Sequence, residues 1–170
     1  MDHIWKLADK KEEKLLREKA VPFDFNSMSR KEIQEMVTKM RKMMKEANGV
    51  GLAANQVGLP FHMFVAEVPD EKSGGKKFYA LFNSKVERNG KETNKVEEGC
   101  LSVPLTYGEV ERPSRVTLTG QDKTGKLVKI KAWGLLARVF QHETDHLNGI
   151  VFIDRAKTLY DLVLEEDEKH

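Results

Sequence analysis

The residues best suited to chemistry are two histidines and a glutamate near the C-terminal end of the chain. His142, Glu143 and His146 form the pattern His-Glu-x-x-His within a stretch of helical periodicity. Side chains four residues apart lie on one face of an α-helix, so both imidazoles can bind one metal ion. Glu143 would lie beside the ion without binding it, where it can accept a proton from water. The pattern predicts a catalytic metal site.

A catalytic site of this kind needs a third protein ligand. One class of metallopeptidases has a further histidine after the second one, but Phe152 occupies that position here. Another class uses a glutamate about twenty residues further on, where Glu165 and Glu166 lie in a charged run. The remaining soft donor is Cys100, whose acidic and glycine neighbours indicate an open turn. We favour Cys100 and keep the two glutamates as the alternative.

Length and composition limit the class of protein. The chain has 170 residues, a formal net charge of +2 and one cysteine. This length predicts one domain, which we assign to residues 1–170. A single cysteine excludes an intramolecular disulfide and favours a reducing, cytoplasmic location. No apolar stretch is long enough to span a membrane, and the net charge gives no electrostatic reason to expect a nucleic-acid partner.

Local patterns predict the helices that hold these residues. Ser29 and Glu32 form a capping box, so an N-terminal amphipathic helix is expected to begin there and to end at Asn48-Gly49. A second apolar periodicity follows Gly134 and predicts the metal-binding helix over residues 135–147. Before the first helix, residues 1–28 are charged and only weakly periodic, which indicates a surface arm attached to the core at Leu15, Leu16, Ala20 and Val21.

Short β-rich runs separate the two helices. They span residues 61–68, 77–83, 115–121 and 127–133. Residues 122–125, Asp-Lys-Thr-Gly, predict a hairpin turn between the last two runs. Helix, antiparallel strands and helix in this order indicate an α+β fold, with the strands packed around the central metal-binding helix. Residues 155–170 form a short acidic tail that we expect to end as a frayed helix.

Three motifs together resemble the bacterial-type peptide deformylase family. They are GVGLAANQ at residues 49–56, EGCLS at 98–102 and QHETDHLNG at 141–149, and they follow the family's order. The likeness extends from about Leu16-Arg17 to Asp154. It implies a hydrolase that removes the formyl group from the N-terminal formylmethionine of new polypeptides and releases formate.

The resemblance also implies a role for each catalytic group. Cys100, His142 and His146 would hold one Fe²⁺ ion, with Zn²⁺, Ni²⁺ or Co²⁺ as substitutes. Glu143 would act as the general base. The side-chain amide of Gln56 and the backbone N–H of Leu101 would donate hydrogen bonds to the oxyanion that forms on the substrate.

Further residues are implied for the substrate and for the support of the site. The substrate pocket and its rim would be formed by Val50, Gly51, Glu98, Gly99, Leu135 and Val139. Glycine at position 51 is interpreted as a place where the backbone closely approaches another chain. Asp145 is expected to orient the helix through a basic partner such as Arg112. For Arg138, one turn before His142, we expect a guanidinium that extends into solvent.

Two other functions stay open at this point. One is the metallopeptidase with a glutamate ligand, and the other is a catalytically silent binding module of the same fold. The partner implied by the resemblance is the N-terminus of a nascent polypeptide. The acidic tail argues against ribosome docking through a basic C-terminal helix, so any ribosome contact would be transient and made elsewhere. We expect a monomer.

Overall fold

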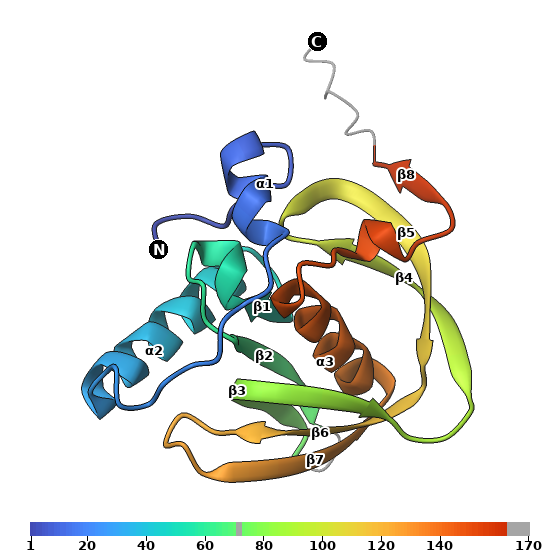
Figure 1. The fold of residues 1–170 in the computed structure, drawn as a ribbon. Helices are drawn as coiled ribbons and strands as arrows, with labels where there is room; N and C mark the ends of the chain where they lie inside the picture. Colours follow the sequence, from blue (N-terminus) through green and yellow to red (C-terminus); the bar gives the residue numbers. More distant parts are fainter. Residues whose placement is uncertain (71–72, 163–170) are drawn as a thin grey trace.

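The computed structural model describes residues 1–70 and 73–162 (Figure 1). Its helices and strands are, in chain order, α1 Lys10–Leu16, α2 Arg30–Glu46, β1 Gly51–Ala53, η1 Ala54–Val57, β2 Met63–Asp70, β3 Gly75–Arg88, β4 Thr93–Cys100, β5 Val103–Pro113, β6 Arg115–Gln121, β7 Leu127–Trp133, α3 Gly134–Leu147, η2 Phe152–Asp154 and β8 Leu159–Asp161. The two η elements are single turns of 3₁₀ helix.

The strands form two antiparallel sheets. The larger sheet has the order β1-β2-β3-β6-β7, and the smaller one has the order β4-β5-β8. Helix α3 lies between them and packs against strands of both (Figure 1). This arrangement confirms the predicted α+β class, with antiparallel strands around a central helix.

Helix α2 forms where the capping box predicts it. The Ser29 hydroxyl accepts from the Glu32 N–H at 3.2 Å, and the Glu32 carboxylate accepts from the Ser29 N–H at 2.7 Å. Its apolar stripe is buried against the larger sheet, with Met40 and Met44 completely covered. These methionines are therefore core residues, as is usual for methionine on an apolar stripe.

The ends of helix α3 are determined by two glycines. Gly134 has a φ of +58° directly after β7, and Gly149 has a φ of +74° after the last turn. At Gly149 a Cβ atom would lie 2.2 Å from the carbonyl oxygen of Arg17. Glycine here lets residues 17–20 cross the end of α3, where the N–H of Ala20 donates to the carbonyl of Leu147 at 2.8 Å.

Several elements differ from the sequence-based expectations. The arm contains helix α1, which is capped by Asp9 and attached through the buried Leu16 and Ala20, whereas the Val21 side chain is half exposed. Cys100 ends strand β4 and does not lie in an open turn. Strands β4 and β5 were not predicted, and their backbones pair over residues 93–113. Polar residues dominate β4, which therefore lacks an apolar pattern.

The structure describes the C-terminal region as far as residue 162. Strand β8 extends the smaller sheet by pairing with β5, so part of the expected tail is a strand. The predicted frayed helix end lies outside the described residues. Among the residues that are described, no helix has both the length and the apolar character needed to span a membrane.

Candidate metal centre and active site

Three side chains with metal-binding atoms meet where the end of β4 faces helix α3. The Nε2 atom of His146 lies 3.2 Å from the Sγ of Cys100 and 3.2 Å from the Nε2 of His142. All three ligand atoms lie within 4.8 Å of one another. The sequence spacing of four residues brings the imidazoles together, and the end of β4 brings the sulfur of Cys100 to them.

This donor set suits a divalent metal ion. Ligand atoms about 2.0–2.3 Å from a four-coordinate ion are separated by roughly 3.3–3.6 Å, close to the spacing here. Because Nδ1 of His142 lies 2.9 Å from the carboxylate of Glu98, the Nε2 of this histidine is directed at the other two donors. Three lone pairs that converge in this way repel one another unless a cation lies between them. Thiolate and imidazole together favour Zn²⁺ or Fe²⁺ over Mg²⁺ or Ca²⁺.

Burial and neighbouring charges shift the pKa values of two of these groups. Burial alone would lower the pKa of His142, but the Cys100 sulfur and the Glu98 carboxylate outweigh it and raise the pKa to about 10. Burial alone would raise the pKa of Cys100, but the charge of His146 and hydrogen bonds from both imidazoles hold it well below its ordinary value. These surroundings favour the thiolate, the form that binds metal.

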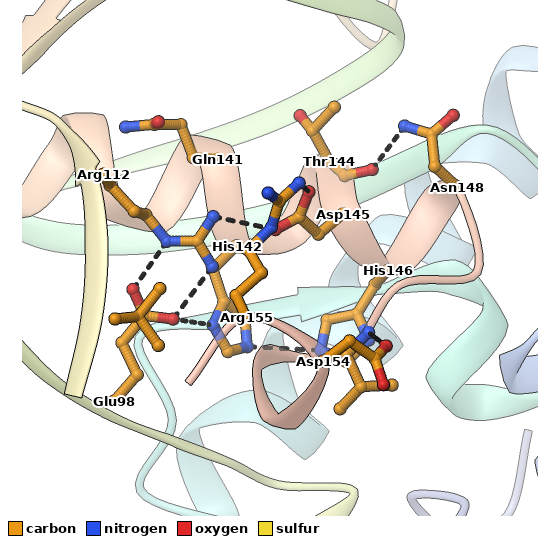
Figure 2. Close-up of polar contacts among 12 residues, drawn as sticks. Glu98, Arg112, Gln141, His142, Thr144, Asp145, His146, Asn148, Asp154 and Arg155 are labelled. Atoms are coloured by element: carbon orange, nitrogen blue, oxygen red, sulfur yellow. Dashed lines mark hydrogen bonds and ion pairs between the residues drawn. The ribbon is translucent and has the colours of Figure 1, made fainter. Parts of the chain in front are cut away.

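Glu98 is the centre of a buried network of charges beside the metal-binding residues (Figure 2). Its carboxylate accepts from Arg112 Nε at 2.6 Å, Arg112 Nη2 at 2.9 Å and Arg138 Nη1 at 2.6 Å, besides His142. Burial would raise the pKa of Glu98, but hydrogen bonds from Arg112 and His142 hold it far below its usual range. Glu98 therefore stays ionised and fixes the His142 ring.

Asp145 lies on helix α3, which also carries His142 and His146, and it is held by two arginines. Arg112 Nη1 donates to its carboxylate at 2.7 Å, and Arg155 donates through Nε and Nη2, both at 2.6 Å (Figure 2). The pairing of Asp145 with Arg112 is the one expected from the sequence. Arg112 thus links the carboxylates of Asp145 and Glu98, and through Glu98 it supports His142.

The expectation for Arg138 is wrong. Its side chain is 9% exposed, and its guanidinium donates to Glu98, to the carbonyl of Val110 at 3.0 Å and to Oδ1 of Asn94 at 2.7 Å. The guanidinium therefore turns inward to strands β4 and β5. An arginine can be buried here because every partner is an acceptor and one is a full negative charge.

Glu143 is buried next to the candidate metal ligands. It is 3% exposed, and its Oε2 atom has no hydrogen-bond partner within the described structure. Burial raises the pKa of this carboxyl to about 7, although the nearby charges of His142 and His146 oppose the rise. A carboxyl with this pKa can both accept and return a proton near neutral pH.

Gln56 is fixed in place by the turn η1. Its Oε1 accepts from the N–H of Ala53 at 2.9 Å, so its Nε2 must point the other way. That Nε2 donates to the Oγ of Ser102 at 3.1 Å and lies 3.6 Å from the sulfur of Cys100. The amide therefore adds hydrogen-bond donors to the site without adding a charge.

A cleft of about 600 Å³ opens onto this site. Among the residues predicted from the sequence, those that line it are Val50, Gly51, Gln56, Glu98, Gly99, Cys100, Leu101, Leu135, Val139, His142 and Glu143. The apolar side chains at its rim are half exposed, at 45% for Val50 and 49% for Leu135. His146, Arg112 and Asp145 are buried and do not form part of the lining.

Sequence reasoning missed several residues of this region. Ser102 lies in the EGCLS motif, two residues after the cysteine, and this spacing was the available signal. Arg155 gave no signal, because its role depends on how η2 folds back on α3. Lys6, in the N-terminal arm, also lines the cleft, although it is 94 residues from Cys100 along the chain. The alternative ligands Glu165 and Glu166 lie outside the described residues.

Comparisons with known proteins agree with these motifs. The family model described as polypeptide deformylase matches residues 2–161. A peptide deformylase of Rhizobium meliloti is 43% identical over 140 residues, which cover 81% of this chain and 79% of the relative. Peptide deformylases of Rhodopirellula baltica and Bartonella quintana are 45% and 39% identical, over segments that cover 60% and 86% of their own length.

Solved structures of the family share the fold. A probable peptide deformylase from Synechococcus phage S-SSM7 has a TM-score of 0.79 and 39% identity, over 89% of this chain and 97% of that one. A peptide deformylase from Synechococcus elongatus in complex with actinonin has a TM-score of 0.79 and 35% identity, over 91% of this chain and 78% of that one. By sequence, fold and motif order, the chain belongs to the polypeptide deformylase family of metalloenzymes, and its activity is that of a peptide deformylase.

Proposed function

We propose that this enzyme removes the formyl group from the N-terminal formylmethionine of newly made polypeptides and releases formate. The observation that carries the proposal is the meeting of three metal-binding atoms, from Cys100, His142 and His146, beside the buried carboxyl of Glu143. Peptide hydrolysis through a glutamate ligand is not favoured, because the Cys100 sulfur lies beside the two imidazoles and can supply the third ligand.

Cys100, His142 and His146 would hold the metal ion. Fe²⁺ is proposed as the physiological ion on the resemblance to the family, with Zn²⁺, Ni²⁺ and Co²⁺ as substitutes that the same donors accept. When bound, the ion supplies a Lewis acid that acidifies water and polarises the formyl carbonyl. Metal analysis after anaerobic purification identifies the ion, and a fully active preparation with zinc alone would contradict iron.

The proton transfers are assigned to Glu143. It would accept the proton of the attacking water and pass it to the nitrogen that leaves when the formyl C–N bond breaks. Its pKa of about 7 suits both steps. Gln56 Nε2 and the N–H of Leu101 would donate hydrogen bonds to the oxygen on which negative charge develops.

Substrate binding is assigned to the cleft. The methionine side chain would lie among Val50, Leu135 and Val139, which are apolar residues of its lining. The peptide would extend beside the backbone of Gly51 and Gly99, since β1 and β4 are edge strands of the larger and the smaller sheet. The nascent chain is the proposed partner, and we propose a monomeric, cytoplasmic enzyme with at most transient ribosome contact.

The direct test is formate release from formyl-Met-Ala-Ser by the iron-loaded protein under anaerobic conditions. The expected result is catalytic release by the parent and none above background by Glu143→Ala. The same variant should keep its metal, because Glu143 is not among the proposed ligands. No release by the iron-loaded parent contradicts the proposal.

Cys100→Ser separates the proposal from its rivals. It should lose both metal and deformylase activity, since serine is a poor ligand at neutral pH. A metallopeptidase that used Glu165 or Glu166 would keep its metal in this variant. A silent binding module would bind formyl peptides equally well in the parent, in Cys100→Ser and in Glu143→Ala, and none of them would release formate.

A further inference from the structure

The N-terminal arm is hydrogen-bonded to two segments of the active site. The N–H of Trp5 donates to the carbonyl of Gln56 at 2.7 Å, and the N–H of Leu7 donates to the carbonyl of Ser102 at 2.9 Å. Between these contacts, Nζ of Lys6 donates to the carbonyl of Leu101 at 2.6 Å. Three consecutive residues thus join η1 to the turn that follows β4.

Both segments carry hydrogen-bond donors to the sulfur of Cys100. The N–H of Ser102 lies 3.4 Å from Sγ, and Nε2 of Gln56 lies 3.6 Å from it. The two donors are also joined to each other, because Nε2 of Gln56 donates to Oγ of Ser102 at 3.1 Å. The arm is therefore hydrogen-bonded to both segments that supply these donors to the sulfur.

Of the three hydrogen bonds made by residues 5–7, only that of Lys6 comes from a side chain. Its ammonium donates to the oxygen of the peptide bond between Leu101 and Ser102, and the N–H of that same peptide bond faces the Cys100 sulfur. A charged donor on the oxygen polarises the peptide group and strengthens the hydrogen bond that its N–H gives. Lys6 therefore acts on the sulfur through one peptide unit.

The position of Lys6 is itself fixed. Its backbone N–H donates to Oε2 of Glu12 at 2.6 Å, and Oε1 of Glu12 lies 2.6 Å from the His3 ring. The ring of Trp5 covers Gly58, where a Cβ atom would lie 2.7 Å from it. The lysine is half-buried, and its ammonium is held at the cleft wall by a well-anchored backbone.

We propose that Lys6 is a positioning residue for the proposed metal centre: its ammonium holds and polarises the Leu101–Ser102 peptide, and this peptide sets the hydrogen bond to the Cys100 thiolate. The inference rests on the proposed function, because it assigns Cys100 as a metal ligand. It adds the N-terminal arm to the parts of the chain that tune that ligand.

The test compares Lys6→Met, Lys6→Arg and the exposed control Lys14→Met in the full chain. Two readouts are used: amide hydrogen exchange of Ser102 in the metal-free protein, and Co²⁺ affinity by chelator competition with the thiolate-to-cobalt absorption band. Support for a metal ligand is worth about 10- to 100-fold in affinity. In Lys6→Met the amide hydrogen of Ser102 should exchange about tenfold faster. The variant should bind Co²⁺ about tenfold more weakly, and its thiolate-to-cobalt absorption band should shift.

The two other variants decide whether the ammonium is responsible. Lys6→Arg should return both readouts to within about threefold of the parent, since guanidinium keeps the charge and the donors. Lys14→Met should match the parent. Unchanged exchange of the Ser102 amide and unchanged Co²⁺ affinity in Lys6→Met overturn the inference. It is also overturned if Lys6→Arg shows the same changes as Lys6→Met. If the parent itself binds no Co²⁺ through sulfur, the proposed metal centre fails, and the exchange readout alone decides the role of Lys6.

Discussion

A Cβ atom at position 51 would lie 2.3 Å from Oε1 of Glu143. This finding gives a reason for glycine at Gly51 that differs from the one inferred from the sequence, which was close approach of another chain. The closest neighbour is the proposed catalytic carboxyl of the same chain. Gly51 lies in β1 without a positive φ, so the missing side chain, and not an unusual backbone, is what this position requires.

Gly51→Ala should therefore displace Glu143. A catalytic group moved by about 1 Å can cost about 100-fold in rate, so we expect a loss in kcat of that order. Metal content should stay near that of the parent, because no proposed ligand is touched. Steady-state kinetics and metal analysis check both points. The control is Gly75→Ala, where the nearest atom to the new Cβ is 3.7 Å away. Parent-like kcat in Gly51→Ala would show that Glu143 does not need this space.

Arg138→Leu should destabilise the fold. It removes a buried cation from Glu98 and leaves the acceptors of Asn94 and Val110 without their donor. Since Glu98 keeps Arg112 and His142, we expect a loss of about 2–3 kcal/mol in the free energy of unfolding. Urea denaturation measures it, with the exposed Arg30→Leu as the control. A loss no larger than that of the control would mean that the buried contacts of Arg138 add no net stability.

The pH dependence of stability should report on Glu143. Its pKa is about 7 in the folded, metal-free protein, above the unfolded value of roughly 4.3. The folded state thus holds the proton more tightly, and stability declines as pH rises from below the unfolded value through about 7. Glu143→Gln stays neutral and escapes this decline.

The expected difference is measurable by urea denaturation of chelator-treated protein. The free energy of unfolding of Glu143→Gln minus that of the parent should be about 2 kcal/mol larger at pH 8 than at pH 5. The exposed substitution Glu18→Gln should show no such difference. The raised pKa of Glu143 is refuted if the two variants have the same pH dependence.

Asp145→Asn should weaken the support of the metal centre. The amide keeps one acceptor oxygen, whereas the carboxylate now receives three hydrogen bonds from Arg112 and Arg155. We expect metal affinity to fall about tenfold and turnover to fall with it. Chelator competition and formate release check this, with Asp2→Asn as the control. Unchanged metal content and turnover would remove Asp145 from this role.

The sequence alone was sufficient for elements whose signals are local. Helix α2 begins at the predicted capping box, and β6 and β7 have the predicted bounds of residues 115–121 and 127–133. Helix α3 spans Gly134–Leu147, one residue more than the predicted 135–147. Caps, turns and apolar periodicity act over a few residues, so they are readable without the fold. The sequence also sufficed to place His142 and His146 on one face of the helix, because residues four apart are one helical turn apart.

Only the tertiary structure decided what distant polar residues do. Strand β4 carries little apolar patterning, yet its place in the fold brings Cys100 to His146 and Glu98 to Arg138. A charged side chain is exposed or buried according to the partners that other segments bring to it, and those partners are not local in the sequence. For that reason Arg138 was expected in solvent and lies inside, and Lys6 gave no sign that it contacts the active site.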